Sequence, residues 1–207
     1  MDRTSGLPPA SRIDAVIGSV TQPTNREHAL VVTVDEGGAS LGTCTVAEAH
    51  AGSGVRHRAF SVLLRDPRGR VLLQRRASVK TRFPGAWANT CCGHPAPEED
   101  LAVSAARRLT EEMGLRGIRL VEAGSFAYQA TDPATGRVEH EFDHVLVGRT
   151  DTDPIPDPAE VADWCWLAPS SLPDLPPRLA GASARYAPWL APVLRLACAH
   201  WEASGRG

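Results

Sequence analysis

The sequence predicts an α/β fold of the α+β type, in which helices pack on both faces of one mixed β-sheet. Three observations support this fold class. Short apolar runs such as 60–65 and 70–75 are joined by turn residues, here Asp66-Pro67-Arg68-Gly69. An amphipathic helix occupies the middle of the chain, and a second helix is expected from about residue 182 to residue 201.

The strands alternate with residues that favour turns. Residues 43–57 carry two histidines and are expected to form a polar loop or a short helix, and residues 168–181 form a proline-rich connector before the last helix. The predicted strands cover residues 29–35, 60–65, 70–75, 118–130 (one or two strands), 137–149 and 161–167.

The central helix is predicted from an apolar stripe that repeats every four residues: Leu101, Ala105, Leu109 and Met113. Acidic residues precede it, where the positive end of a helix favours them, and Gly114 stands where a left-handed C-cap is expected. The charged residues of the last turn should lie mostly away from the apolar stripe; they are Arg107, Arg108, Glu111 and Glu112.

A chain of 207 residues can bury one sizeable core, so we expect a single domain over residues 25–204 that includes the C-terminal helix. Residues 1–24 mix Pro, Ser, Gly and Thr without periodicity, which is typical of a flexible leader. The formal net charge of −2 predicts a protein that binds neither nucleic acid nor an anionic membrane.

The five cysteines show no paired spacing that would indicate disulfides. The sequence contains neither a signal-peptide core nor an apolar run of about 18 residues. We therefore expect free thiols and a cytoplasmic location.

Candidate metal ligands occur in several separate segments. Glu139 and Glu141 stand two apart in a predicted strand, so both carboxylates project from one face and His140 from the other. Like charges this close repel one another unless a cation compensates them. The histidines that could join them in an open nitrogen and oxygen site for a divalent metal are His50, His57 and His94.

Each of these residues also has an ordinary explanation when it is taken alone. A histidine in a loop is usually solvated or hydrogen-bonded, a Glu-x-Glu pair usually lies on an exposed strand face, and adjacent cysteines usually fill a core. The spacing in the sequence leaves open whether these side chains converge.

The central segment resembles the Nudix box. Gly93 is followed after five residues by Glu99, and after seven more by Arg107-Arg108-Leu109-Thr110-Glu111-Glu112. Arg108 stands where the Nudix hydrolases carry the first glutamate of their core motif. That departure, together with the run Asn89-Thr90-Cys91-Cys92-Gly93-His94-Pro95, resembles the type I isopentenyl-diphosphate isomerases, a non-hydrolytic branch of the Nudix fold. The resemblance extends from about His50 to Trp189.

The resemblance implies a Nudix-like sheet and an active site built from matching positions. Cys92 would be the catalytic thiol, while Cys91 would pack in the core. Tyr128, in Tyr-x-Ala-Thr-Asp-Pro, would be the active-site tyrosine, and Trp189 would be the late tryptophan beside the substrate. The implied ligands of one divalent metal (Mn, Zn or Fe) are His50, His57, His94, Glu139 and Glu141.

The resemblance also implies a site for the substrate diphosphate. Its contacts would come from Arg76, Lys80 and Arg108, and Glu112 would hold a second metal, Mg²⁺, against the diphosphate. The family carries a lysine four residues before its first histidine, whereas this chain has Val46 there. One diphosphate contact is therefore expected to be missing or to come from an arginine.

The implied reaction interconverts isopentenyl and dimethylallyl diphosphate through a carbocation-like state, which requires an acid and a base on opposite sides of the substrate. We assign the protonating side to Glu141 near Tyr128 and proton acceptance to Cys92, whose pKa His94 or a metal would lower. The ring of Trp189 would stabilise the cation.

Two other functions are compatible with the sequence. A Nudix diphosphate hydrolase would retain Glu111 and Glu112, but Arg108 and the Cys-Gly-His run argue against it. A non-catalytic binding protein would keep the fold without the chemistry. We expect a monomer or a weak homodimer.

Overall fold

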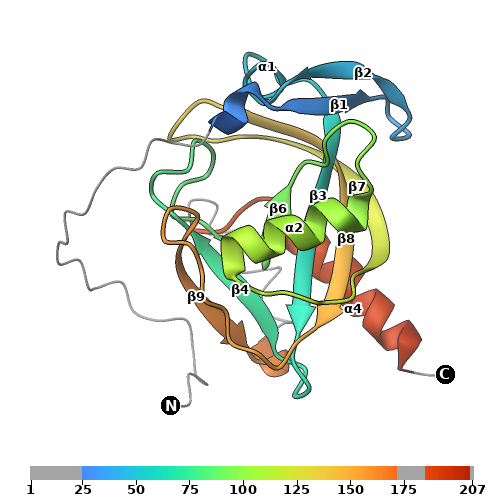
Figure 1. Cartoon of the computed structure of the whole chain (residues 1–207), viewed down its shortest axis with the longest axis vertical. Helices are drawn as coiled ribbons and strands as arrows, with labels where there is room; N and C mark the ends of the chain where they lie inside the picture. The colour runs from blue at the N-terminus through green and yellow to red at the C-terminus, as the bar shows by residue number, and fades with distance from the viewer. Residues whose placement is uncertain (1–24, 172–184, 206–207) are drawn as a thin grey trace.

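The computed structural model describes residues 25–171 and 185–205. In these residues nine strands form one mixed sheet, and helices lie on both of its faces (Figure 1). Helix α2 (Leu101–Met113) covers one face and α4 (Leu190–Ser204) covers the other. This arrangement confirms the predicted mixed sheet between helices.

The remaining elements are short and follow one another closely. In chain order they are η1 (Asn25–His28), β1 (Leu30–Val34), β2 (Ser40–Thr45), α1 (Val46–Ala49), β3 (His57–Arg65), β4 (Val71–Arg76), β5 (Trp87–Ala88), β6 (Cys91–Gly93), β7 (Val121–Thr131), β8 (Val138–Arg149), β9 (Val161–Leu167) and η2 (Pro169–Ser171).

Strand β3 is the centre of the sheet. It pairs in parallel with β8 from His57↔Glu141 to Arg65↔Arg149, and β8 pairs antiparallel with β7. By contrast, β3 and β4 pair only at Arg65↔Val71. Beyond that pair the two strands separate, and the short strands fill the opening: β5 pairs with β4, and β6 pairs with β3.

Two apolar cores hold the layers together. The core under α4 contains Leu63, Val145 and Leu190, whereas the core under α2 contains Phe60, Leu109 and Met113. Burying such side chains is worth about 1.5–3 kcal/mol each. Cys91 is fully buried in the second core, in keeping with a packing role.

Helix α2 matches its predicted ends. Asp100 accepts a hydrogen bond from Val103 N as the N-cap, and Gly114 adopts a left-handed φ of 69° as the C-cap. The prediction for the last turn is only partly correct, because Arg108 and Glu112 are buried. Their side chains do lie off the apolar stripe, but they point into a pocket and not into solvent.

Two segments differ from the prediction. Residues 40–45 form strand β2, whose side chains are mostly exposed and therefore give no alternating pattern. Helix α4 begins at Leu190, later than expected, because the chain just before it pairs with β5: Trp87 N donates to Arg185 O, and Ala187 N donates to Trp87 O. Residues 1–24 and 182–184, where a leader and the start of the helix were expected, lie outside the described residues.

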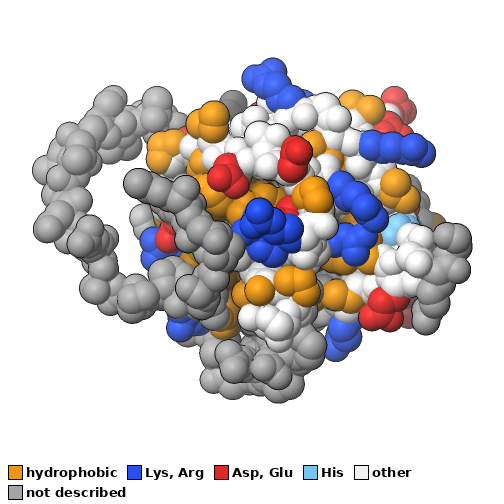
Figure 2. All heavy atoms as spheres, turned by 90° about the horizontal axis from the view of Figure 1, so that it is seen from below, with side chains coloured by type: hydrophobic (Ala, Val, Ile, Leu, Met, Phe, Trp, Pro, Cys, Tyr) orange, Lys and Arg blue, Asp and Glu red, His pale blue; other side chains and the backbone are white. Residues whose placement is uncertain are grey.

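Charge is dispersed on the surface that can be seen from below. Among the described residues of that face, basic side chains occur in several separate places between acidic, apolar and uncharged atoms (Figure 2). In the described part of the chain, no helix is long and apolar enough to cross a bilayer.

Candidate active site

The predicted metal ligands come together at one end of the central strands. His50 is the C-cap of α1, His57 opens β3, His94 follows β6, and Glu141 lies on β8. One ligand atom from each of these four residues lies within 4.8 Å of the others. Glu139 joins them through Oε2, which lies 2.9 Å from Nε2 of His50.

The sheet register explains this convergence. The parallel pairing sets His57 beside Glu141, and the β7–β8 pairing sets Tyr128 on the other side of Glu141. Residues directly opposite one another on neighbouring strands have side chains in reach of one another. The side chains of β8 also alternate between its two faces as predicted. His140 lies on the face opposite Glu139 and Glu141, where it contacts Gly54 O and Arg56.

Hydrogen bonds at Nδ1 orient the rings of His50 and His57 so that their Nε2 atoms face the cluster. Nδ1 of His50 lies 2.7 Å from Val46 O, and Nδ1 of His57 lies 2.8 Å from Val55 O. A carbonyl oxygen can only accept, so both Nδ1 atoms carry a proton and the Nε2 atoms face the other members of the cluster.

The Nε2 atoms lie close to other nitrogen and oxygen atoms that can bind a metal. His57 Nε2 lies 3.2 Å from His94 Nε2, and His94 Nε2 lies 2.9 Å from Glu141 Oε1. Without protons on the Nε2 atoms, these groups repel one another unless a cation lies among them. The imidazole and carboxylate donors of this cluster therefore fit a divalent metal ion.

Electrostatics in the cluster favour a neutral His94 and an ionised Glu141, whereas the Glu141 carboxylate outweighs burial at His57 and raises the pKa of that ring. Burial, with smaller effects from the neighbouring histidines, lowers the pKa of His94 to about 3. Burial by itself would raise the pKa of Glu141, but hydrogen bonds from His57 and His94 outweigh it and hold that pKa well below its usual value. Neutral imidazoles and a carboxylate are the protonation states that bind metals.

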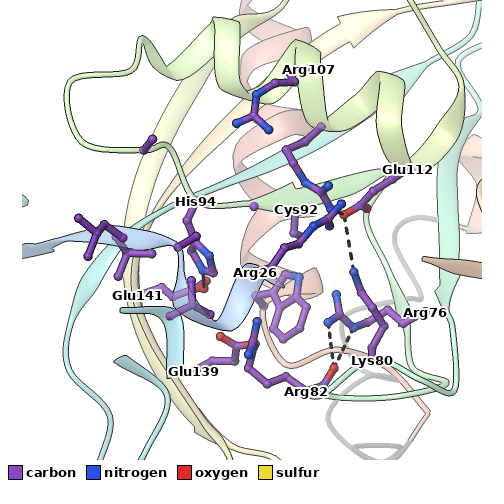
Figure 3. A pocket seen from close by; sticks show the side chains of 18 of the residues that line it. Arg26, Arg76, Lys80, Arg82, Cys92, His94, Arg107, Glu112, Glu139 and Glu141 are labelled. Atoms are coloured by element: carbon purple, nitrogen blue, oxygen red, sulfur yellow. Dashed lines mark hydrogen bonds and ion pairs between the residues drawn. The ribbon is translucent and has the colours of Figure 1, made fainter. Parts of the chain in front are cut away.

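Cys92 lies beside this cluster in the same pocket (Figure 3). Its Sγ donates to Asn89 Oδ1 at 3.2 Å and lies 3.7 Å from Ser61 Oγ. Burial, with the Asp143 carboxyl as the next cause, raises the pKa of the Cys92 thiol to about 12. The expectation that His94 lowers this pKa is wrong, because His94 is itself neutral and makes no hydrogen bond to the thiol.

Tyr128 and Trp189 complete the apolar side of the pocket. Tyr128 OH donates to Glu141 Oε2 at 2.6 Å, and burial keeps the pKa of the phenol well above its usual value. The Trp189 ring lies 5.9 Å from the Tyr128 ring, centroid to centroid. Trp189 also packs in the core under α4, so its core and pocket roles coexist.

The pocket has a volume of about 230 Å³ and is rich in cations on the side away from the histidines. Its charged and polar lining residues include Arg26, Arg76, Lys80, Arg82, Cys92, His94, Arg107, Arg108, Glu112, Glu139 and Glu141. In Figure 3 the basic side chains reach inward from α2, from η1, from the end of β4 and from the loop after it. A concentration of arginine and lysine in a cavity is typical of a phosphate-binding site.

Glu112 lies among these cations. Its carboxylate accepts from Gln74 Nε2 at 3.2 Å, pairs with Arg108, and lies 3.7 Å from Lys80 Nζ. Burial would raise the pKa of Glu112, but the surrounding cations, Lys80 first, hold it below its usual value. Because cations already surround this single carboxylate, it can bind Mg²⁺ only when the ion also carries other anionic ligands.

Several pocket residues were not predicted from the sequence. Arg26 and Arg82 line the pocket together with Val46, and Asn89 bonds to both Cys92 and Trp189. Arg82 stands two residues after Lys80 in a basic run, which was the available signal. The contacts of Asn89 depend on how the strands separate, and the sequence carries no local sign of that.

Known proteins resemble this chain along most of its length. The family model described as NUDIX domain matches residues 55–190. Isopentenyl-diphosphate Delta-isomerase from Nocardia farcinica is 58% identical over 177 residues, covering 85% of this chain and 99% of that protein. The isomerase of the same name from Streptomyces griseus is 45% identical over 168 residues, covering 81% and 83% of the two chains.

The fold has counterparts among solved structures as well. The crystal structure of DR0079 from Deinococcus radiodurans superposes with a TM-score of 0.63 at 23% identity, covering 80% of this chain and 97% of that one. This likeness concerns the fold alone. From the match to the domain model and the identity to the curated relatives, the chain belongs to the Nudix-fold isopentenyl-diphosphate Delta-isomerase family.

Proposed function

We propose that this protein is an isomerase that interconverts isopentenyl diphosphate and dimethylallyl diphosphate. Relatives of that name align with nearly the whole domain. The observation that carries the proposal is one pocket that holds the Cys92 thiol, the Tyr128–Glu141 pair and a cation-rich wall. Proton transfer on a small substrate with an apolar tail and a diphosphate head group requires these groups.

The reaction moves one proton onto the substrate and another off it. The terminal alkene carbon gains a proton, and the carbon on the diphosphate side of the branch loses one, through a tertiary carbocation-like state. We assign proton donation to Glu141, oriented by the hydrogen bond from Tyr128, and proton acceptance to Cys92 on the opposite side.

The protonation preferences of the two groups identify one stage of this cycle. The pKa of Cys92 is raised and that of Glu141 is lowered, so the proton resides on the thiol. That is the state left after isopentenyl diphosphate has been converted, and it is also the state that starts the reverse reaction. A proton must return to Glu141 before the next forward turnover.

The cluster of His50, His57, His94, Glu139 and Glu141 would hold a divalent ion, for which Mn, Zn and Fe are the candidates. Bound there, the ion would supply positive charge that holds the Glu141 carboxylate beside the substrate. Tyr128 holds the other oxygen of that carboxylate, so its orientation is set from two sides.

The cation-rich wall would bind the diphosphate through Arg76, Lys80 and Arg108, with Glu112 and Mg²⁺ beside it. Arg76 is the most available of these cations. Within residues 25–171 and 185–205 it has no carboxylate partner, and its guanidinium donates only to Arg82 O. Binding energy from this non-reacting group then orients the alkene.

The apolar end would contain the isoprenoid carbons. The Trp189 ring, which is 3% exposed, offers an electron-rich face to a carbocation, for roughly 2 kcal/mol when desolvated. The same enclosure excludes water, which would otherwise trap the cation as an alcohol.

The test is incubation of the purified protein with isopentenyl diphosphate and Mg²⁺, followed by identification of the product. Cys92→Ala should abolish isomerisation while leaving fold and metal content intact. Cys91→Ala is the matched control, because that thiol packs in the core under α2 and should be replaceable with only a loss of stability. Wild-type turnover by Cys92→Ala would refute the role of the thiol.

The hydrolase alternative makes a different product. A Nudix hydrolase would release phosphate or a nucleotide from nucleoside diphosphate compounds, so the same preparation should be assayed for both products. Arg108, paired with Glu112, stands in place of the hydrolase glutamate and disfavours that activity. A non-catalytic binding protein would give neither product.

We further propose a single domain over residues 25–204, which the one shared sheet and its two flanking cores support. A monomer or weak homodimer remains the predicted state, and sedimentation measures it directly.

A further inference from the structure

We propose that Asn89 is a positioning residue that fixes the Cys92 thiol and the Trp189 indole relative to one another. This inference rests on the isomerase function proposed for the pocket. The carboxamide oxygen of Asn89 accepts from both groups, from Trp189 Nε1 at 3.0 Å and from Cys92 Sγ at 3.2 Å. One atom therefore joins the proposed proton acceptor to the proposed cation-stabilising ring.

The orientation of this carboxamide is fully determined. Nδ2 of Asn89 donates to Val62 O at 3.1 Å and to Cys91 O at 2.8 Å. A carboxamide has two N–H donors and two acceptor lone pairs, and all four are used here. A flipped amide would set its oxygen against two carbonyls and its NH₂ against two donors, so only the observed orientation is satisfied. The residue is 0% exposed, and water cannot substitute for a lost bond.

The position of Asn89 follows from the opening between β3 and β4. Where these strands separate, side chains take over hydrogen bonds that a continuous ladder would make. Asn89 holds Val62 O of β3, and the adjacent Thr90 bridges the two strands through Oγ1, accepting from Leu64 N and donating to Leu72 O. Thr90 has no hydrogen bond to Cys92 or Trp189, whereas Asn89 bonds to both.

The two groups that Asn89 joins belong to distant elements. Cys92 lies on β6, and Trp189 stands directly before α4 on one side of the sheet. Without a shared partner, their separation would depend on how β6 and α4 pack independently. A displacement of about 1 Å in a reacting group can cost about 100-fold in rate. A common acceptor fixes the spacing of the ring and the protonated thiol, the state that starts the reverse reaction, around the substrate.

The matched pair Asn89→Ala and Thr90→Val tests this role. Both changes remove side-chain hydrogen bonds at the same opening of the sheet, and both should lower the melting temperature. Only Asn89→Ala should lower kcat, by about 100-fold. Its KM for isopentenyl diphosphate should stay within roughly threefold of wild type, because Asn89 is not among the lining residues that carry the basic charge.

A second readout does not depend on activity. The indole N–H signal of Trp189 in a ¹H–¹⁵N spectrum, identified by its loss in Trp189→Phe, should shift in Asn89→Ala and stay in place in Thr90→Val. The Trp166 indole, which donates to Asp153 at 2.8 Å, is the internal reference and should not move in either variant.

The proposal is overturned if Asn89→Ala loses no more kcat than Thr90→Val, or if its Trp189 indole signal is unchanged. Should Asn89→Ala not fold, Asn89→Ser takes its place, since serine keeps a hydroxyl at the opening but is too short to hold both Sγ and Nε1. A wild-type protein that failed to isomerise would sink the proposed function alone, and the indole measurement would still decide the Asn89 contact.

Discussion

The histidines of the cluster differ in how they are held. His50 and His57 are anchored by backbone carbonyls at Nδ1, whereas the contacts of His94 are to other members of the cluster, His57 and Glu141. His94 also lines the pocket, in contrast to the two fully buried rings. It is therefore the ligand whose removal should disturb the metal most and the fold least.

His94→Ala should lower the content of bound first-row metal, measured by elemental analysis after dialysis. Loss of a direct ligand should weaken affinity by at least the roughly 10–100-fold that loss of an outer-shell partner costs. His144→Ala is the control, since His144 lies on the other face of β8 and pairs with Glu122. An unchanged metal-to-protein ratio in His94→Ala would refute the ligand assignment.

Arg82 is one of the arginines that line the same pocket as Val46, where the family carries a lysine. It balances two carboxylates, Glu27 at 2.9 Å and Glu139 at 3.5 Å. Arg82→Gln should raise KM for isopentenyl diphosphate about 10-fold with little change in kcat, as expected for loss of one charge-assisted contact. Arg75→Gln, at an exposed position outside the pocket, should leave KM unchanged. Equal KM values for the two variants would assign the missing contact elsewhere.

Helices and strands with a local sequence pattern could be predicted, whereas those that depend on distant pairing could not. The α2 helix and strand β9 were found from the sequence, because their apolar periodicity and end residues are local. The start of α4 was misplaced because residues 185–187 pair with Trp87, about a hundred positions earlier in the chain. Strand β2 was missed because its outward-facing side chains give no alternating signal.

The C-terminal end of α2 offers a stability test. Gly114 and Gly117 have left-handed φ angles of 69° and 68°, but a Cβ at Gly114 would lie 2.6 Å from Ile155 O, whereas one at Gly117 meets nothing within 4 Å. Gly117→Ala should cost about 1 kcal/mol from the backbone alone. Gly114→Ala should cost clearly more in urea unfolding, and equal costs would mean that the contact relaxes freely.

At the scale of the whole molecule, the site ties together segments that are far apart in the sequence. The cluster takes ligands from the end of α1, from β3, from the loop after β6 and from β8. From the residues alone, only the shared face of Glu139 and Glu141 could be derived; the resemblance supplied the rest of the ligand set. Neither the residues alone nor the resemblance predicted the roles of Arg82 and Asn89, because their positions depend on the loop after β4 and on the opening of the sheet.

Metal removal should therefore lower global stability. At a free metal concentration of 100 times Kd, binding adds about 2.7 kcal/mol, which corresponds to a melting temperature about 5–10 °C higher in a domain of this size. The measurement is a thermal melt with and without chelator, and the chelator should have little effect on His94→Ala. A wild-type melt insensitive to chelator would argue against a metal bound at this cluster.

Carboxylates already pair with several cations of the cation-rich wall of the pocket. Glu160 pairs with Lys80 and with Arg26, and Glu112 pairs with Arg108, so these cations are already neutralised before any diphosphate arrives. Substrate and product of the proposed reaction carry the same head group, and a wall of bare cations would retain both equally and invite product inhibition. When the carboxylates pair with these cations again, they weaken binding of the product diphosphate, which lets turnover proceed in either direction.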